Sequence, residues 1–329
     1  LLMKVLRKLA NQNIRYVAME VSSEGLINNR LESIEFDVAI FTNLTHEHLD
    51  THKTMENYFQ AKLKLFEKLN KDGLALANAD SPYAYRINHP NLVTFGIDNV
   101  CDFQAINIRK NVKYTIFDLK TPTIIYKNLK ANILEKYNLY NLLAAIVTAL
   151  HYKIPMNLIH KAIMDLPKIS GRLELLTTDE NFKVYVDFAH TPNALYNVLT
   201  SLKSENKLKV VMGCAGRKDK SKRPLMGEIA TTIADYVYFT SEDPRDEDPH
   251  DIIKDLLSNV KTNNYEIIID RKEAIQKAIM DAKANETIII TGKGNDTYFE
   301  INNQIYQYSD ISEVISALEK RKKLLGEKT

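Results

Sequence analysis

Apolar residues in the first half of the chain follow two patterns. Short apolar runs rich in β-branched and aromatic side chains are typical of parallel strands that are covered on both faces. Such runs lie at residues 15–19, 37–42, 74–77 and 92–95. Apolar positions at helical spacing predict a helix over residues 54–69, with Thr54 as its N-cap. The pattern therefore predicts a parallel sheet covered by helices.

Residues 101–132 have a different pattern. Polar and apolar residues alternate at 102–108 and 113–119, and this alternation predicts a small antiparallel sheet. Residues 137–150 and 155–166 return to helical spacing. The sequence thus predicts an α/β domain over residues 1–169.

After a joint at residues 170–172, strand and helix patterns alternate regularly. The predicted strands are residues 183–186, 208–212, 236–240, 266–269 and 287–291. The predicted helices are residues 192–202, 223–234, 249–260, 271–282 and 311–321. This alternation predicts a second α/β domain over residues 170–329, doubly wound and Rossmann-like.

The composition is typical of a globular protein of about two domains, with 329 residues and 45% hydrophobic side chains. The net charge of +2 gives no reason to expect a nucleic-acid partner. The longest strongly apolar stretch, residues 142–150, is too short to span a bilayer. No signal peptide is visible, and Cys101 and Cys214 form no CxxC pair. We expect a cytoplasmic protein with no membrane partner.

Three residues of the first domain could carry chemistry. Glu20 follows the first predicted strand and His48 follows the second, so the two could share a Mg²⁺ ion. The alternative is that Glu20 caps a helix and that His48 is an exposed loop residue. Lys62 lies on a mostly apolar helix, where a lysine usually keeps its charged end in water. A functional role for Lys62 needs a neighbour such as Mg²⁺ that stabilises an altered charge.

Polar loops follow the predicted strands of the second domain. Asp187 and His190 come after the first of them, where an Asp can hold a ribose or cap the next helix. Residues 213–224 form a basic loop that suits an anion, although a solvated turn has the same composition. Residues 241–249 and 292–296 follow two further strands. We expect all four loops to face one crevice, because the carboxyl ends of parallel strands share one edge.

Taken in order, these segments resemble the Mur ligase family. The matching segments are MEVSSEGLINNR, FTNLTHEHLDTH, YFQAKLKLF, ANADSP, YNLYNLLAA, SGRLE, VDFAHTP, GCAGRKDKSKRPLMGEIA, SEDPRDEDP and TGKGND. They run from near Glu20 to Asp296 and so cover nearly the whole chain. The resemblance implies a P-loop-type central ATPase domain, truncated here, followed by a C-terminal domain that binds an amino acid.

Within this family, the segments are similar to the ligases that add the third residue of the peptidoglycan stem peptide. The resemblance implies an ATP-dependent amide ligase that joins a diamino acid to UDP-MurNAc-L-Ala-D-Glu through an acyl phosphate. It implies ATP and Mg²⁺ as cofactors and a monomeric protein. Positioning and charge neutralisation would carry most of the rate, as in other phosphoryl transfers.

The resemblance also implies roles for individual residues. Glu20, His48 and a carbamylated Lys62 would hold the metal and form the catalytic group. The residues that would contact the UDP-muramoyl dipeptide are Ser22, Asn28 and Arg30. The residues that would contact ATP are Asn138, Arg172, Asp187 and His190. The residues that would contact the diamino acid are Lys218, Asp243, Arg245, Gly292 and Asp296.

The identity of the diamino acid depends on one motif. Family members that use meso-diaminopimelate have DNPR, and this chain has Glu242-Asp243-Pro244-Arg245. Arg245 could pair with the distal carboxylate that meso-diaminopimelate has and lysine lacks. Because of Arg245 we expect meso-diaminopimelate. L-lysine or another diamino acid stays the alternative, since Asp243 replaces the usual Asn and Asp296 the usual Glu. Glu47 likewise stands where the family has Asp.

The family's phosphate loop, GTxGKT, lies upstream of the EVSS motif and is not found in these residues. The first residue is Leu1, and we expect a chain cut inside a domain that cannot form the amide bond alone. Two other hypotheses remain at this point. One is a non-catalytic binding protein of the same fold that has lost ATP turnover. The other is a metal hydrolase built on His46, His48 and His52, for which no second ligand set appears.

Overall fold

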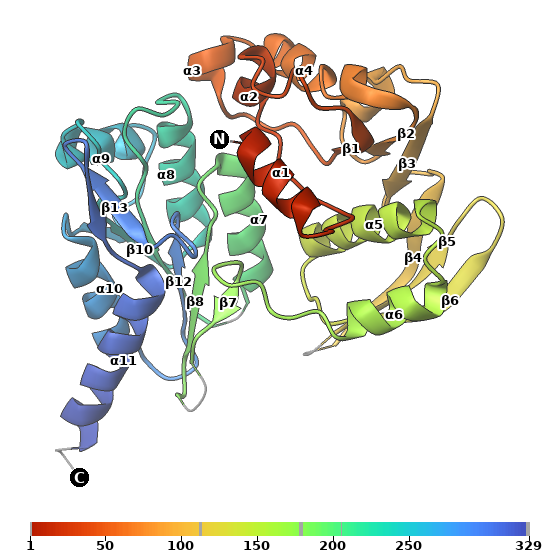
Figure 1. The fold of residues 1–329 in the computed structure, drawn as a ribbon. Helices are drawn as coiled ribbons and strands as arrows, with labels where there is room; N and C mark the ends of the chain where they lie inside the picture. Colours follow the sequence, from red (N-terminus) through yellow and green to blue (C-terminus); the bar gives the residue numbers. More distant parts are fainter. Residues whose placement is uncertain (1, 112–113, 178–179, 205, 327–329) are drawn as a thin grey trace.

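The first domain is built on a six-stranded sheet with the order β1-β2-β3-β4-β5-β6 in a computed structural model that describes residues 2–111, 114–177, 180–204 and 206–326. The strands are β1 (Phe36–Phe41), β2 (Leu69–Asn78), β3 (Leu92–Gly96), β4 (Phe103–Lys110), β5 (Thr115–Lys120) and β6 (Ile125–Ala131). The strands β1 to β4 pair in parallel, and β4, β5 and β6 pair antiparallel. Figure 1 shows this domain in red to yellow-green beside the second domain in green to blue.

The predicted antiparallel strands are confirmed, but they belong to the same sheet as the parallel strands rather than to a small sheet of their own. β4 pairs in parallel with β3 through Phe95–Phe103 and Gly96–Gln104, so the antiparallel strands extend the parallel sheet. Two partner pairs are enough to join them, and alternation within a strand does not reveal which sheet edge it will meet. The strand expected at residues 113–119 corresponds to β5, and residue 113 lies outside the described residues.

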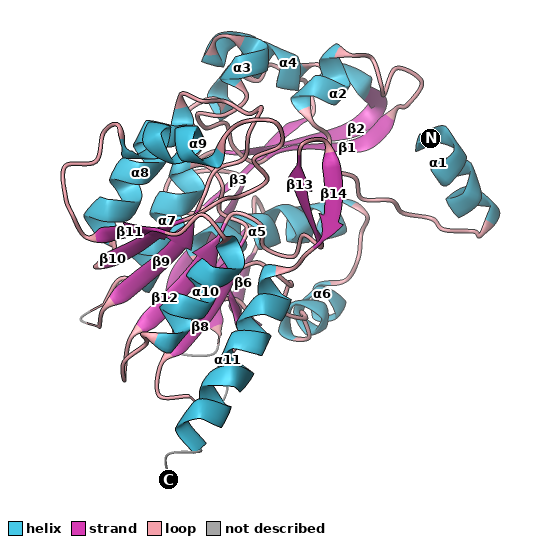
Figure 2. Ribbon diagram, turned by 90° about the vertical axis from the view of Figure 1, so that its left-hand side faces the viewer, coloured by secondary structure: helices cyan, strands magenta, loops and turns pink. Residues whose placement is uncertain are grey.

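The expected strand at residues 15–19 is also wrong. The described chain has no strand before β1, and Tyr16 and Val17 are 65% and 51% exposed. An apolar run becomes a strand only where a neighbouring strand can pair with its backbone groups. Here the segment connects α1 (Leu2–Asn11) to α2 (Ser23–Ile27) without such a partner, and Figure 2 shows α1 standing apart from the sheet.

Helices cover both faces of the first sheet, and successive side chains of β2 point to opposite faces. Leu74 and Leu76 pack in the cluster of α5 (Lys136–His151) and α6 (Met156–Met164). Ala75 and Ala77 pack in the cluster of α4 (Met55–Leu63) on the other face. The expected N-cap is confirmed, because the Thr54 side chain accepts a hydrogen bond from the Asn57 amide. The remaining short helices of this domain are α3 (Leu49–His52), η1 (Phe66–Lys68) and η2 (Ala84–Arg86).

The second domain has the strand order β11-β10-β9-β12-β8-β7. The strands are β7 (Glu174–Leu175), β8 (Lys183–Asp187), β9 (Leu208–Met212), β10 (Tyr236–Phe239), β11 (Tyr265–Ile267) and β12 (Thr287–Thr291). All pairs are parallel except that of β7 with β8. The carboxyl ends of β8, β9, β10 and β12 therefore lie at one edge, which confirms the doubly wound prediction.

Five helices enclose this sheet. α7 (Pro192–Leu202), α8 (Lys222–Ile233) and α9 (Pro249–Leu257) pack in one core cluster, and α10 (Arg271–Met280) and α11 (Asp310–Gly326) pack in the other. The hairpin of β13 (Tyr298–Ile301) and β14 (Gln304–Gln307) was not predicted. No helix in the described part of the chain is long and apolar enough to span a bilayer.

Candidate functional site

The loop after β1 gives its three histidines different surroundings. His48 has a left-handed backbone (φ 58°) at the start of α3. His52 is buried, with its Nε2 atom 2.8 Å from the Ser23 hydroxyl and its ring stacked on Tyr58. His46 instead reaches the second domain, where its Nε2 atom lies 2.9 Å from the Ser221 hydroxyl. The three rings therefore do not converge on one point, and this geometry argues against the hydrolase hypothesis.

Lys62 is held in a partly desolvated position on α4. Its Nζ atom lies 5.2 Å from the centre of the Tyr58 ring. Burial lowers the pKa of Lys62, and the charges of Glu47 and Glu20 oppose that shift. No carboxylate of the described residues lies within ion-pair distance of Nζ. Lys62 thus has a half-buried amine whose pKa is lowered by burial and raised again in part by the charges of two acids.

Glu20 lies in the exposed segment before α2 rather than at the end of a strand. Its charge still acts on Lys62, and the Nε2 atom of His48 lies 3.9 Å from a Glu47 carboxylate oxygen. The described residues contain no ready-made group of three or more His, Cys, Asp or Glu side chains for a metal. Mg²⁺, however, is commonly held by one or two carboxylates together with water and phosphate. The donor set of Glu20, Glu47 and His48 fits that mode.

Glu47 joins the two domains. Its Oε1 atom accepts a hydrogen bond of 3.1 Å from His190 Nε2 and lies 3.9 Å from Lys222 Nζ. Lys222 is itself buried and donates to the His190 carbonyl oxygen at 2.7 Å. Burial would raise the pKa of Glu47, but the hydrogen bond from His190 and the charges of His190, Lys222 and His48 lower it to about 2. Glu47 is therefore an anion at neutral pH, held between the predicted metal and nucleotide sites.

Most of the cations in the basic loop of residues 213–224 already have partners. Arg217 pairs with Asp246, and Lys220 and Arg223 pair with Glu247. Lys218 is exposed, and within the described residues it has no ion pair. The loop is therefore largely neutralised by residues 246–247, and Lys218 is the cation that remains available for an anionic ligand.

The loops after β10 and β12 interlock at the predicted amino-acid site. Lys293 is buried and donates to both carboxylate oxygens of Asp243 at 2.8 Å. Gly292 has a φ of 111°, and a Cβ atom built there would lie 1.9 Å from an Oε2 atom of Glu242. Burial raises the pKa of Glu242. Asp296 is half-buried, and burial also raises its pKa.

Arg245 is fixed by a residue that the sequence interpretation missed. Its Nε atom donates to Glu300 at 2.9 Å, and its Nη1 atom donates to the Gly216 carbonyl oxygen at 2.7 Å. Glu300 lies on β13, in the hairpin that was not predicted. Since the two partners are 55 residues apart, no local pattern could have indicated the pair.

Three of the four predicted nucleotide residues, Arg172, Asp187 and His190, lie at the start of the second domain, and Asn138 lies in the first. Asp187 is buried and accepts backbone hydrogen bonds from Leu173 at 2.7 Å and Ala189 at 2.8 Å. The Arg172 guanidinium lies 4.4 Å from the centre of the Phe188 ring. Asn138 is on α5 and is half-buried. Asp187 thus organises its own turn, while His190 contacts the first domain through Glu47.

The three residues predicted to bind the UDP-muramoyl dipeptide lie in and just after α2. The Ser22 hydroxyl accepts a hydrogen bond of 3.1 Å from the Gly25 amide and so caps this helix. Asn28 is its C-cap, and both Asn28 and Arg30 are exposed. The structure therefore leaves Asn28 and Arg30 accessible and gives Ser22 a structural partner.

Two family matches cover most of the chain. Residues 2–149 match the Mur ligase middle domain, and residues 171–294 match the Mur ligase glutamate ligase domain. A solved UDP-N-acetylmuramoyl-L-alanyl-D-glutamate--2,6-diaminopimelate ligase is 31% identical, with a TM-score of 0.60, and the match covers 97% of this chain and 68% of that one. The chain belongs to the Mur ligase family.

Two further Mur ligases have higher sequence identity to this chain than that solved structure. The UDP-N-acetylmuramoyl-L-alanyl-D-glutamate--2,6-diaminopimelate ligase of Bacillus velezensis is 40% identical over 94% of this chain and 65% of its own length. The ligase of the same name from Clostridium botulinum is 38% identical over 96% of this chain and 66% of its own length. The chain thus spans about 65% of the length of such relatives.

The Mur ligase assignment explains the order of the loops but not the partners within them. Motif matching identified Lys62, His48 and Arg245 as candidates. It did not indicate that Glu47 would join the domains, or that Lys293 and Glu300 would hold Asp243 and Arg245. The substitution of Asp by Glu at position 47 was the one visible signal, because a longer acid reaches further from its loop.

Proposed function

We propose that the protein carrying this chain is an ATP-dependent ligase that joins meso-diaminopimelate to UDP-N-acetylmuramoyl-L-alanyl-D-glutamate, a step of peptidoglycan precursor synthesis. The names of the 38–40% identical relatives support the reaction. The observation that carries the proposal is the half-buried Lys62 amine, which lies 5.2 Å from the centre of the Tyr58 ring and has its pKa lowered by burial against the charges of Glu47 and Glu20. An ordinary surface lysine would not lie in such a position.

Carbamylation of Lys62 is part of this proposal. The neutral amine attacks CO₂, a C–N bond forms, and a proton is released, so the cation becomes an anionic carbamate. A lowered pKa favours the step because only the neutral amine reacts. Mg²⁺, when bound, would neutralise phosphate charge at this site. Glu20, His48 and the carbamate would hold or orient it, and Glu47 would add a fourth group.

The second domain would present the diamino acid. Lys218 and Arg245 offer positive charge for its carboxylates, and Asp296 offers an acceptor for an ammonium group. Gly292 leaves the space at the end of β12 that a side chain would fill. Asp243 is already paired with Lys293, so we propose that it shapes the site rather than reading the ligand's charge.

The nucleotide would lie between the domains. We propose that Asn138, Arg172, Asp187 and His190 surround ATP, and that Ser22, Asn28 and Arg30 lie on the side of the UDP-muramoyl dipeptide. The cytoplasmic location and the monomeric state stay predictions. So does the inactivity of residues 1–329 by themselves, which the assay below tests when it is applied to this polypeptide.

The test is phosphate release by the protein that carries this chain, measured with ATP, Mg²⁺ and UDP-MurNAc-L-Ala-D-Glu. We expect release that depends on meso-diaminopimelate, with formation of the UDP-muramoyl tripeptide confirmed by mass. Calorimetry with the amino acid alone and with Mg·ATP distinguishes the ligase from a non-catalytic binding protein. Binding of the amino acid without any amino-acid-dependent phosphate release would favour a non-catalytic binding protein and overturn the ligase proposal.

A further inference from the structure

The hairpin of β13 and β14 attaches to the loop after β10 through its backbone. The Arg245 amide donates to the Glu300 carbonyl oxygen at 3.0 Å, and the Asn302 amide donates to the Arg245 carbonyl oxygen. The Glu300 amide donates to Asp243 Oδ1 at 3.0 Å. Arg245 and Ile301 thereby form an isolated parallel bridge. The hairpin is thus fixed to the two residues at the centre of the substrate motif.

The Glu300 side chain completes this attachment by holding the Arg245 guanidinium. Its Oε2 atom lies 2.9 Å from Nε, and the two side chains are 25% and 18% exposed. Glu300 accepts a hydrogen bond from the single N–H of Nε, and the Gly216 carbonyl oxygen accepts one from Nη1. A guanidinium has five N–H donors, so three remain on Nη1 and Nη2. These form its outer end, the edge that binds a carboxylate with two parallel hydrogen bonds.

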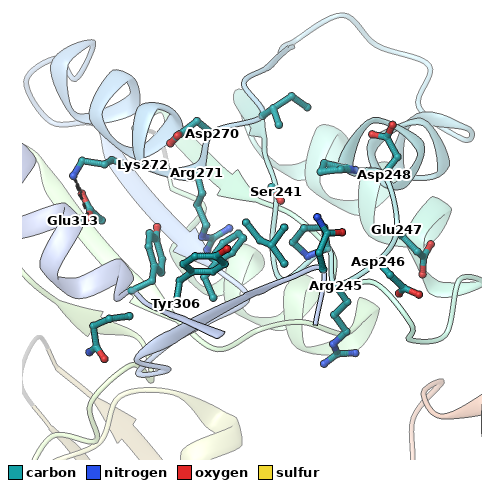
Figure 3. A pocket seen from close by; sticks show the side chains of 18 residues that line it. Ser241, Arg245, Asp246, Glu247, Asp248, Asp270, Arg271, Lys272, Tyr306 and Glu313 are labelled. Atoms are coloured by element: carbon teal, nitrogen blue, oxygen red, sulfur yellow. Dashed lines mark hydrogen bonds and ion pairs between the residues drawn. The ribbon is translucent and has the colours of Figure 1, made fainter. Parts of the chain in front are cut away.

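The Arg245 side chain points away from the cavity beside the hairpin. A cavity of about 780 Å³ lies behind the loop, between the hairpin and the start of α10. Figure 3 shows the labelled Arg245 side chain pointing out of this cavity, away from Arg271 and Tyr306. Glu300 and Gly216 therefore hold the guanidinium on the side of the substrate loops.

We propose that Glu300 is a positioning residue that aims Arg245 at the distal carboxylate of the incoming amino acid. This inference rests on the proposed ligase function. A free arginine loses rotamer entropy when it is ordered by a ligand, and the Glu300 contact orders it before substrate arrives. The held guanidinium favours a substrate with a second carboxylate, because the ammonium at the end of a lysine would face the same N–H donors.

The test compares Glu300→Ala, Glu300→Gln and Arg245→Ala in the protein that carries this chain. A hydrogen bond between charged groups is expected to change the KM for meso-diaminopimelate about 10- to 100-fold when it is lost. We expect that rise for Glu300→Ala, with the KM for ATP and the melting temperature little changed. Glu300→Gln keeps an acceptor for Nε and should recover most of the affinity. In the Arg245→Ala background, Glu300→Ala should have no further effect.

The matched control is Glu266→Ala, which removes an exposed glutamate 3.9 Å from Lys277 in the same domain and should leave every KM unchanged. An unchanged KM for meso-diaminopimelate in Glu300→Ala, or an effect that adds fully to that of Arg245→Ala, would overturn the inference. Equal use of L-lysine by the unmodified protein would overturn it as well and leave the ligase function standing. Absence of any amino-acid-dependent phosphate release in the unmodified protein would remove the proposed function and this inference together.

Discussion

Lys62 shows how a neighbouring ring and two acids can prepare one side chain for chemistry. The Tyr58 ring, 5.2 Å from Nζ, excludes water from one side of the amine. The lowered pKa of Lys62 follows first from this burial, and the charges of Glu47 and Glu20 limit the shift. Converting the amine to a carbamate would reverse its charge and make it a ligand for a cation. This is the physical basis for the proposal that Lys62 is carbamylated.

We predict that Lys62→Ala lowers ligase turnover at least about 100-fold, the scale expected when a positioned catalytic group is removed. Added acetate or formate should restore part of the activity, because a small carboxylate can occupy the space left by the carbamate. Phosphate release with and without the added acid measures this. Lys64→Ala, at an exposed position just after α4, is the control and should keep full activity. Equal losses in both variants, with no response to acetate, would show that Lys62 acts only by packing.

The side chain of Glu242 limits which residue can stand at position 292. The Oε2 atom of Glu242 is buried without a hydrogen-bond partner among the described residues. It lies where the Cβ atom of any larger residue at position 292 would be, and the φ of 111° there also favours glycine. Position 292 therefore requires glycine for two reasons, space for Glu242 and backbone conformation.

At the scale of elements, α10 and α11 are joined through one buried ion pair. The Nε and Nη2 atoms of Arg271, at the start of α10, donate to the two carboxylate oxygens of Asp310 at 2.8 and 2.7 Å. Nη2 also donates to the Thr291 carbonyl oxygen at the end of β12. The pair thus connects both helices to the strand that precedes the substrate loop at residues 292–296.

We predict that Arg271→Ala destabilises the second domain by about 3–5 kcal/mol, because it leaves Asp310 buried and unpaired. Urea unfolding followed by circular dichroism measures the change. Lys277→Ala removes an exposed pair with Asp281 on the same helix and should cost less than about 0.5 kcal/mol. A loss below about 1 kcal/mol for Arg271→Ala would mean that water or a rearrangement satisfies Asp310.

The elements that the sequence predicted correctly are those with strong local periodicity. β9, β12 and α7 have the expected bounds, because the two strands are fully buried apolar runs and α7 has one buried face that begins after the Thr191 cap. The segment at residues 15–19 failed because a strand depends on a neighbour that its own residues do not specify. The hairpin of β13 and β14 was missed because Phe299 is its one buried side chain among mostly exposed ones such as Ile305, so no alternating buried face marks it.

The candidate site was predictable to a similar extent. The strand order predicted that four loops of the second domain would share one edge, but not that residues 46–49 would lie against residues 219–222. The pairing within the site was not predictable, since Glu47–His190 and Arg245–Glu300 join residues that are distant in sequence. Charge partners are selected by three-dimensional packing, and a single sequence carries no periodic signal for them.

At the scale of the whole molecule, a few polar contacts connect the two domains next to the proposed site. His46 meets Ser221, the Leu49 amide donates to Asp219 at 3.4 Å, and Glu47 accepts from His190. Polar contacts of this kind stabilise one arrangement without burying much apolar surface, so opening and closing of the domains should cost little. Among these three contacts, the one made by Glu47 also brings its carboxylate within 3.9 Å of the Lys222 amine.

We therefore predict that Glu47→Gln loosens the contact between the domains. Hydrogen exchange of residues 219–222 and 46–49 should become about 10- to 100-fold faster, the factor expected for the loss of a charge-assisted hydrogen bond. Glu56→Gln is the matched control, because Glu56 pairs with Arg86 within the first domain and should not affect the interdomain loops. Unchanged exchange in Glu47→Gln would show that the other contacts suffice to hold the domains.

Acid should reproduce the effect of the Glu47 substitution in the unmodified protein. The folded-state pKa of Glu47 is lowered from 4.5 to about 2, so its contribution is complete above pH 4.5. That contribution is then lost as the pH falls from 4.5 through about 2, because the carboxyl group takes up a proton. Small-angle scattering across this range should show domain opening in the unmodified protein. Other carboxylates titrate in the same window, so the informative quantity is the difference from Glu47→Gln, which should open without this step; identical profiles would assign the opening to another acid.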